Sequence, residues 1–405
     1  MKKIIICVFA FVLTINCFSE GRIENNLLAN DFLVESIKAT GADNEKIEKY
    51  EAVFFERTSD FISRVEEIDD ADDKAEFALT YCYEKLLKKF KLDQSDICYT
   101  LDSGFYNCVS SCIFYVYFLK VMGYEFEVFE TDDHVFVEIF VNGNRVRVET
   151  TNPYGFNPGE EKHAPESDSY YRATPKNYRN QKLVDDRRLV GMIYSNRVSL
   201  LFKKSLYEQA YQIALDSLEI QEYSEEAVDL LDMAGSNLAA FYARKKKNRE
   251  ALDLARKHKE IYGLSTRWAK NTGAAVSNLL NDSFDISDYP AAFEILEAEK
   301  DLLTESNYNS MKYTTVSNYI NWLSSDVGFD EAMEELNARS DYLKKSDYTT
   351  YEKRIKNHEA VRIHNECVPL MNSGEYDKAV EILEAGLEKI GPNSTLQNDL
   401  KRIKK

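Results

Sequence analysis

The stretch that decides the fold is 134–149, which reads HVFVEIFVNGNRVRVE. In it, two runs of β-branched and aromatic residues alternate with polar residues and are joined by Asn142-Gly143. Alternation of this kind is typical of a strand that buries one face. Asn-Gly is strongly favoured in a two-residue hairpin turn, because both central positions need a positive φ. We therefore predict an antiparallel hairpin that turns at these two residues.

The two-residue turn also sets the register of the hairpin. Val141 then faces Asn144, and counting back along both strands places His134 and Glu149 on one face of the sheet. They become diagonal neighbours ~7–8 Å apart at the backbone, a separation that a glutamate can span. A three-residue loop would instead turn Glu149 to the opposite face. A further alternative is that His134 is an ordinary strand residue without a role in chemistry.

An apolar segment of helical length begins at Cys108 and ends before Gly123, a residue typical of helix termination. Asn107 is a favourable residue for capping the start of this helix. A cysteine in the first turn lies at the positive end of the helix dipole, which favours the nucleophilic thiolate. Cys112 lies one turn deeper among apolar residues, and we interpret it as a small core residue.

A thiol at a helix start, an imidazole on one strand and a carboxylate on the next are the components of a thiol acyl-transfer site. Cys108, His134 and Glu149 provide these components, in this order along the chain. They are our candidate catalytic residues.

Four segments of the chain resemble the transglutaminase-like domain, which has a papain-like thiol fold. They are 107–111 (NCVSS), 134–137 (HVFV), 148–153 (VETTNP) and 189–196 (LVGMIYSN). The resemblance covers roughly residues 90 to 200 and is closest to a bacterial subgroup in which this domain precedes tetratricopeptide repeats.

The resemblance implies a role for each candidate residue. Cys108 would be the nucleophile and His134 the general base and acid, and Glu149 would orient the imidazole in the place that aspartate takes in many relatives. The chain lacks the tryptophan-containing strand that precedes the acid in protein crosslinkers. The resemblance therefore implies hydrolysis, or a site without turnover, rather than crosslinking.

The second half of the chain repeats an aromatic-x-x-Ala motif followed by an apolar helix. The copies lie at Tyr207–Ala210, Tyr289–Ala292, Phe329–Ala332 and Tyr376–Ala379, with a weaker copy at Asn248–Ala251. Their alanines, at 210, 251, 292, 332 and 379, are 41, 41, 40 and 47 residues apart. Near-constant spacing is typical of stacked helical hairpins, in which a small residue lets two helices pack closely. The last copy resembles a tetratricopeptide repeat.

These patterns predict an α+β chain with two regions after its first residues. Residues 25–188 would form the transglutaminase-like domain, in which N-terminal helices precede a helix and an antiparallel sheet. Residues 189–405 would form an all-α, tetratricopeptide-like helical repeat solenoid. A plain helical bundle is the alternative for this second region.

The composition of the 405 residues argues against several classes of protein. A formal net charge of −18 argues against nucleic acid as a partner, because phosphate binding needs a basic surface. Beyond Cys17 the chain has an odd number of irregularly spaced cysteines, which is not a disulfide framework, although one bridge stays open. There is no CxxC pair and no HExxH motif, so we predict no metal and no cofactor.

Residues 1–19 have the pattern of a bacterial export signal. Two lysines precede the apolar run 4–12, which is too short to anchor the chain across a bilayer. The sequence LTINC, ending at Cys17, resembles a relaxed lipobox and would leave Cys17 lipidated at the mature N-terminus. The alternative is cleavage by ordinary signal peptidase after Ser19. We expect a location in the periplasm or cell envelope, with membrane attachment if Cys17 is lipidated.

Two functional hypotheses follow. In the first, the protein is an exported thiol hydrolase or acyltransferase that acts on peptide or amide bonds, and its repeats bind a protein or peptide partner. In the second, the repeats carry the function as a binding scaffold, and the Cys108–His134–Glu149 triad is vestigial.

Overall fold

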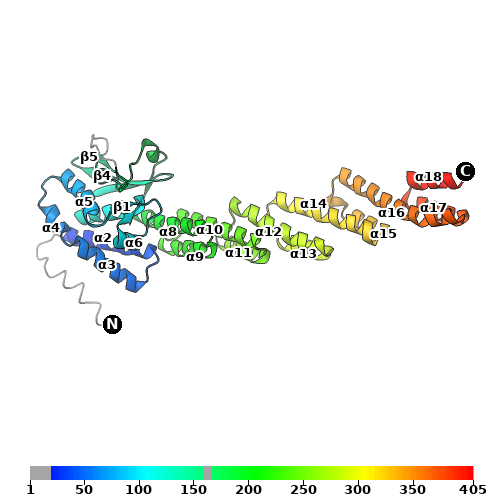
Figure 1. Ribbon diagram of the computed structural model, residues 1–405, viewed down its shortest axis with the longest axis horizontal. Coiled ribbons are helices and arrows are strands. Elements are labelled where there is room, and N and C mark those ends of the chain that lie inside the picture. Colours follow the sequence, from blue (N-terminus) through cyan, green and yellow to red (C-terminus); the bar gives the residue numbers. More distant parts are fainter. Residues whose placement is uncertain (1–19, 158–166, 405) are drawn as a thin grey trace. The chain divides into compact units, whose positions relative to one another are not determined.

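The computed structural model describes residues 20–157 and 167–404 (Figure 1). The expected export signal at 1–19, including Cys17, lies outside these residues. The chain divides into two compact units, the first ending at Ala234 and the second beginning at Gly235. The expected domain boundary at 188/189 stays a prediction.

Helices precede the sheet in the first unit. They are α2 (Glu20–Ala39), α3 (Asn44–Thr58), α4 (Phe61–Glu66), α5 (Ala71–Lys85), α6 (Ile97–Ser103) and α7 (Cys108–Met122). Helices α3, α5 and α6 each follow an aspartate whose side chain accepts a first-turn N–H: Asp43, Asp70 and Asp96. Such caps satisfy donors that have no partner inside the helix and so fix where each helix begins.

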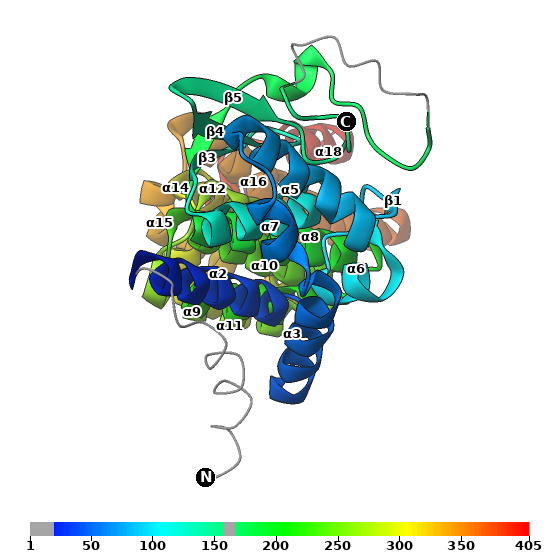
Figure 2. The same ribbon diagram turned by 90° about the vertical axis from the view of Figure 1, so that its left-hand side faces the viewer.

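Helix α7 is the core of the first unit. It packs against α2, α5 and β4, and Figure 2 shows it between α2 and the sheet. Its buried aromatic residues contact helices that come earlier in the chain. Phe114 stacks on Phe54 with ring centroids 5.8 Å apart, and Phe118 packs against Phe61 at 4.2 Å. Burial on all sides explains why the sequence of α7 is apolar throughout rather than amphipathic.

The antiparallel sheet has the strand order β5-β4-β3-β6. Its strands are β3 (Glu125–Glu130), β4 (Val135–Val141), β5 (Asn144–Val148) and β6 (Lys182–Val184). Val141 pairs with Asn144, and the turn residues Asn142 and Gly143 have φ values of 51° and 76°. The predicted hairpin, its turn and its register are therefore confirmed, and the three-residue loop is excluded.

The described residues between Pro153 and Lys182 include a 3₁₀ turn (η1, Pro175–Tyr178) and lead into β6, which pairs with β3. A short parallel pair, β1 (Lys89–Phe90) with β2 (Phe105–Tyr106), was not predicted. Elements of two or three residues depend on a distant partner strand, so they leave little periodic pattern in the sequence.

From Asp186 onward the described chain consists of helices and short turns. The helices are α8 (Asp186–Lys203), α9 (Tyr207–Ile220), α10 (Glu225–Arg244), α11 (Asn248–Tyr262), α12 (Thr266–Asp285), α13 (Tyr289–Ala298), α14 (Glu305–Trp322), α15 (Phe329–Ala338), α16 (Lys345–Ser373), α17 (Tyr376–Ile390) and α18 (Ser394–Ile403). Short 3₁₀ or π turns lie at η2 (Lys300–Leu302), η3 (Leu323–Val327) and η4 (Ser340–Tyr342).

The repeated sequence motif coincides with alternate helices. Helices α9, α11, α13, α15 and α17 each begin at the first residue of one motif copy, and the alanine of every copy is buried. The last interval between copies is longer because α16 has 29 residues, against 20 in α12. In the second unit, helices from α11 to α18 pack against their neighbours in chain order around successive apolar clusters. This region is a solenoid-like helical repeat array.

None of the described helices combines the length and the apolar character needed to cross a bilayer.

Candidate active site

Cys108 is the first residue of α7, and a capping box fixes the start of that helix. The Asn107 side-chain oxygen accepts the N–H groups of Val109 (3.0 Å) and Ser110 (3.2 Å), and the Ser110 hydroxyl accepts the N–H of Asn107 (3.0 Å). Asn107 Nδ2 also donates to the carbonyl of Leu92. The predicted cap is therefore confirmed. It holds the Cys108 thiol at the positive end of the helix dipole.

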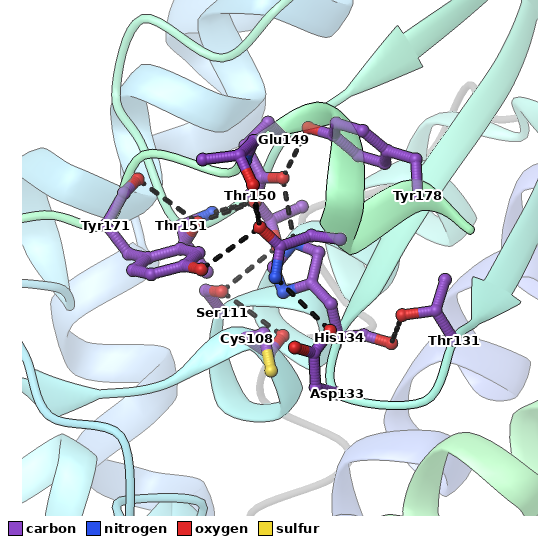
Figure 3. A network of polar contacts seen from close by, with 12 residues as sticks. Cys108, Ser111, Thr131, Asp133, His134, Glu149, Thr150, Thr151, Tyr171 and Tyr178 are labelled. Atoms are coloured by element: carbon purple, nitrogen blue, oxygen red, sulfur yellow. Dashed lines mark hydrogen bonds and ion pairs between the residues drawn. The ribbon is translucent and has the colours of Figure 1, made fainter.

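His134 and Glu149 are brought together as the hairpin register predicts. His134 Nε2 lies 2.8 Å from Glu149 Oε2, and the two residues are 6% and 3% exposed. Figure 3 shows the pair above the helix end that carries Cys108. A hydrogen bond this well shielded from water is stronger than one on the surface.

The positive charge of a protonated His134 and the negative charge of an ionised Glu149 stabilise each other. Burial acts to lower the pKa of His134, but hydrogen bonds and charge interactions with Cys108 and Glu149 outweigh it and raise that pKa to about 10. Burial acts to raise the pKa of Glu149, but its hydrogen bond and charge interaction with His134 hold that pKa below the usual range. An ionised Glu149 holds the proton on Nε2 of His134. Nδ1 is therefore the nitrogen that can exchange a proton with the thiol.

Both oxygens of the Glu149 carboxylate have partners. Oε1 accepts from the backbone N–H of Thr151 (3.1 Å) and from its hydroxyl (2.6 Å). Oε2, which His134 uses, also accepts from the hydroxyl of Tyr178 at 2.9 Å. Burial, followed by the charge of Glu149, raises the pKa of the Tyr178 phenol, so it remains a donor. Sequence reasoning missed Tyr178, because it lies in a segment without periodicity.

Hydrogen bonds join the chain after Glu149 to helices of the first unit and to β2. The hydroxyls of Thr150 and Ser111 lie 3.0 Å apart, which joins this segment to α7. Tyr83 donates to the carbonyl of Thr150 (2.7 Å), and Tyr106 donates to that of Thr151 (3.2 Å). These buried contacts hold Glu149 in a fixed position relative to Cys108, even though the two residues belong to different layers.

The segment 167–180 covers the imidazole. The Tyr171 N–H donates to the carbonyl of Thr151 at 3.1 Å, and the Tyr171 ring lies 5.9 Å from the ring of His134. Asn177 accepts from the Tyr171 hydroxyl and donates to Asp133. The rings of Tyr171 and Tyr178, both labelled in Figure 3, lie against the imidazole and explain why the His134–Glu149 pair is shielded from water.

Cys108 differs from every other cysteine in the described part of the chain. It is partly exposed, whereas Cys82, Cys98, Cys112 and Cys367 are buried, and all five are free thiols. Burial raises the pKa of Cys112 well above the usual range, which fits its interpretation as a core residue. Within residues 20–157 and 167–404, no three His, Cys, Asp or Glu side chains are grouped to hold a metal ion.

Comparisons with known proteins give no family. No protein-family model matches the chain, and no curated protein matches it. A solved structure of menin, titled as revealing the binding site for the Mixed Lineage Leukemia (MLL) protein, is similar over 72% of this chain and 84% of that one. That similarity has 12% identity and a TM-score of 0.31, which is too low to support any argument about fold or function. The transglutaminase-like identity of the first unit stays a prediction.

Proposed function

We propose that this protein is a transglutaminase-like thiol hydrolase or acyltransferase that acts on peptide or amide bonds. The observation that carries the proposal is the buried hydrogen bond between His134 and Glu149 beside a partly exposed Cys108 at a helix start. The interaction of Cys108 with His134 contributes to the raised pKa of the imidazole. Nucleophile, base and orienting group are therefore linked in the order that thiol acyl transfer needs.

In the proposed reaction, His134 Nδ1 accepts the thiol proton and the Cys108 thiolate attacks the carbonyl carbon of the substrate. The tetrahedral intermediate collapses as the C–N bond breaks, and the imidazolium gives its proton to the leaving amine. Water, deprotonated by His134, then attacks the thioester and releases the acid and the free thiol. In acyl transfer a second amine takes the place of water.

The backbone N–H of Cys108 is suited to stabilising the oxyanion. The N–H groups of Val109 and Ser110 are occupied by the Asn107 side chain, and that of Ser111 by the Asn107 carbonyl. In the described chain, no acceptor takes the N–H of Cys108. A donor at the helix end beside the nucleophile is where charge develops on the carbonyl oxygen.

The helical repeats would supply recognition. Stacked helical hairpins present extended surfaces suited to peptides and helices. We place the enzyme in the periplasm or cell envelope, lipid-anchored if Cys17 is modified, with a protein or peptide partner bound by the repeats.

The proposal is tested by the reactivity of Cys108. The purified protein is treated with iodoacetamide across pH 5–10, and the modified peptide is quantified by mass spectrometry. We expect Cys108 to react well below the pH at which an unperturbed thiol does, and His134→Ala to remove that advantage. A Cys108 that reacts like a free thiol with or without His134 would overturn the proposed function.

One observation favours the alternative of a non-catalytic scaffold. A groove of about 1040 Å³ in the first unit is lined by β3, β6, the start of α8 and the turn between α9 and α10. None of the triad residues lines it. A protein that binds without turnover would use such grooves and its repeats, and it would keep the triad as a structural element.

A further inference from the structure

Two ion pairs share one face of the hairpin. In the observed register Glu138 lies opposite Arg147, and Val137 lies opposite Val148, the last residue of β5. Glu149 directly follows β5, two residues after Arg147, and two residues of extended chain span ~7 Å. Arg147 pairs with Glu138 through contacts of 3.0 and 3.1 Å, while Glu149 pairs with His134. Of the two arginines in β5, Arg147 is nevertheless the one nearer to Glu149 along the chain.

Two aromatic rings separate these pairs. The Arg147 guanidinium lies 4.7 Å from the ring centroid of Tyr178 and 5.0 Å from that of Phe136. The two rings meet edge to face, with centroids 5.1 Å apart and planes at 88°. The far end of the Tyr178 ring carries the hydroxyl that donates to Glu149. The face of the Tyr178 ring therefore contacts the Arg147 guanidinium, and the Tyr178 hydroxyl donates to the Glu149 carboxylate.

We propose that Tyr178 is a positioning residue of the Cys108–His134–Glu149 site, whose ring keeps Arg147 away from Glu149 so that the carboxylate stays paired with His134. This role rests on the proposed function. The Tyr178 hydroxyl adds a second hydrogen bond to the Glu149 oxygen that is paired with His134.

The alternative pairing is available to Arg147. Glu138 also pairs with Arg145, so it would keep a cationic partner if Arg147 turned toward Glu149. An arginine can bind a carboxylate with two hydrogen bonds, and it would compete strongly with a single imidazole N–H. His134 would then lose the group that sets its tautomer, and the pKa of its imidazole would fall.

The other groups around the pair do not supply a competing cation. His134 is faced by Cys108 from α7, by Glu149 and by the rings of Tyr171 and Tyr178, and it follows Asp133 in the chain. Glu149 is also near the phenols of Tyr83 and Tyr106, whose pKa values are raised chiefly by burial and to a smaller extent by the charge of Glu149. A change in the titration of His134 on loss of the Tyr178 ring would therefore point to Arg147.

The test uses the full-length protein with Tyr178→Ala, Tyr178→Phe, Arg147→Gln and the double variant Tyr178→Ala/Arg147→Gln. Two quantities are measured: the His134 titration by NMR of ¹⁵N-histidine, assigned with His134→Ala, and the pH profile of Cys108 alkylation by iodoacetamide. Tyr171→Phe is the matched control, because its hydroxyl binds Asn177 on the same segment and its ring is kept. Circular dichroism reports whether each variant folds.

For Tyr178→Ala we expect the pKa of His134 to fall by about one unit or more, and alkylation at pH 7 to slow about tenfold. Adding Arg147→Gln should restore both to within about threefold. Tyr178→Phe keeps the ring, so it should keep the His134 pKa and slow alkylation by about threefold at most. Arg147→Gln alone and Tyr171→Phe should change neither quantity.

Two results would overturn the inference: an unchanged His134 titration in Tyr178→Ala, or a change that Arg147→Gln does not reverse. If Tyr178→Ala does not fold, a lowered His134 pKa in Tyr178→Leu, reversed by Arg147→Gln, supports the inference, and an unchanged one overturns it. The titration is read without any reaction at Cys108. Ordinary reactivity of Cys108 in the wild type would therefore count against the proposed function alone.

Discussion

The described chain contains a second set of a cysteine, a histidine and a carboxylate, and its thiol and its histidine differ in exposure from those of the first set. In the repeat unit, His364 on α16 lies 2.5 Å from Asp399 on α18, and Cys367 lies one turn along α16 from His364. The His364 side chain is 30% exposed, whereas that of His134 is 2% exposed. The Cys367 thiol is fully buried and directed at the carbonyl of Ala379.

Under the proposed function, a histidine–carboxylate pair beside a cysteine is not sufficient for a thiol site. Burial raises the pKa of Cys367, and this residue belongs to an apolar cluster between α16 and α17. Cys108 begins a helix, is partly exposed and acts on its histidine by raising the pKa of the imidazole. Placement of the thiol, rather than the presence of the pair, separates the two sets.

The largest expected difference is between the two cysteines. Cys108→Ser should abolish alkylation by iodoacetamide at pH 7, because it removes the reactive thiol. Cys367→Ala should leave that alkylation unchanged and should lower the free energy of unfolding by about 1–2 kcal/mol through lost packing. Intact-mass spectrometry and urea titration measure the two effects. Substantial labelling of Cys367 in the folded protein would contradict the expected difference in reactivity between the two cysteines.

The two histidines come next. His134→Ala should slow alkylation of Cys108 at pH 7 by about 10- to 100-fold, because the thiolate loses its base and counter-ion. His364→Ala should leave the rate within about twofold, because His364 and its partner Asp399 belong to the second compact unit and Cys108 to the first. Equal slowing by both substitutions would contradict a specific role of His134 in the reactivity of Cys108.

The pH dependence of the free energy of unfolding should also report on the His134–Glu149 pair. The pKa of His134 is about 10 in the folded protein, against 6.5 for a free histidine. The folded state thus binds this proton more tightly than the unfolded state. Its contribution to stability is fully present below pH 6.5 and is lost as pH rises toward 10.

Urea titrations at several pH values check this expectation. The free energy of unfolding should decline between pH 6.5 and 10, by an amount on the order of a few kcal/mol, and the decline should be smaller in His134→Ala. His364→Ala serves as the control and should keep the wild-type slope. A decline of the same size in both variants would assign it to other groups.

The smallest expected effect concerns the helix caps. Asn107 caps α7 in the first unit and Asn393 caps α18 in the second, each by accepting a first-turn N–H. Asn107→Ala and Asn393→Ala should each cost about 0.5–2 kcal/mol of stability, with the buried Asn107 at the upper end. Only Asn107→Ala should slow alkylation of Cys108. Equal alkylation rates in the two variants would show that the cap does not position the thiol.

The parts of the fold that could be predicted are those with a local cause. The hairpin follows from Asn142-Gly143 and from alternation on both sides of it, and its register places His134 and Glu149 on one face. The start of α7 follows from Asn107. The repeat helices follow from a motif whose copies coincide with helix starts.

Other parts could not be predicted because their cause is distant in the chain. Strand β6 has three residues and depends on pairing with β3. Tyr178 reaches Glu149 from a segment with no period, so no counting rule places it there. The burial of Cys367 and the exposure of His364 likewise depend on how α16 packs against its neighbours.

The sequence by itself determined the hairpin, the helix that begins at Cys108 and the phase of the repeats, because turn chemistry, capping and periodicity act over a few residues. Only the tertiary structure decided which histidine–carboxylate pair is shielded beside a partly exposed thiol, and which aromatic side chains enclose it. Those properties depend on water being excluded by segments that are far apart in sequence and meet only in the folded protein.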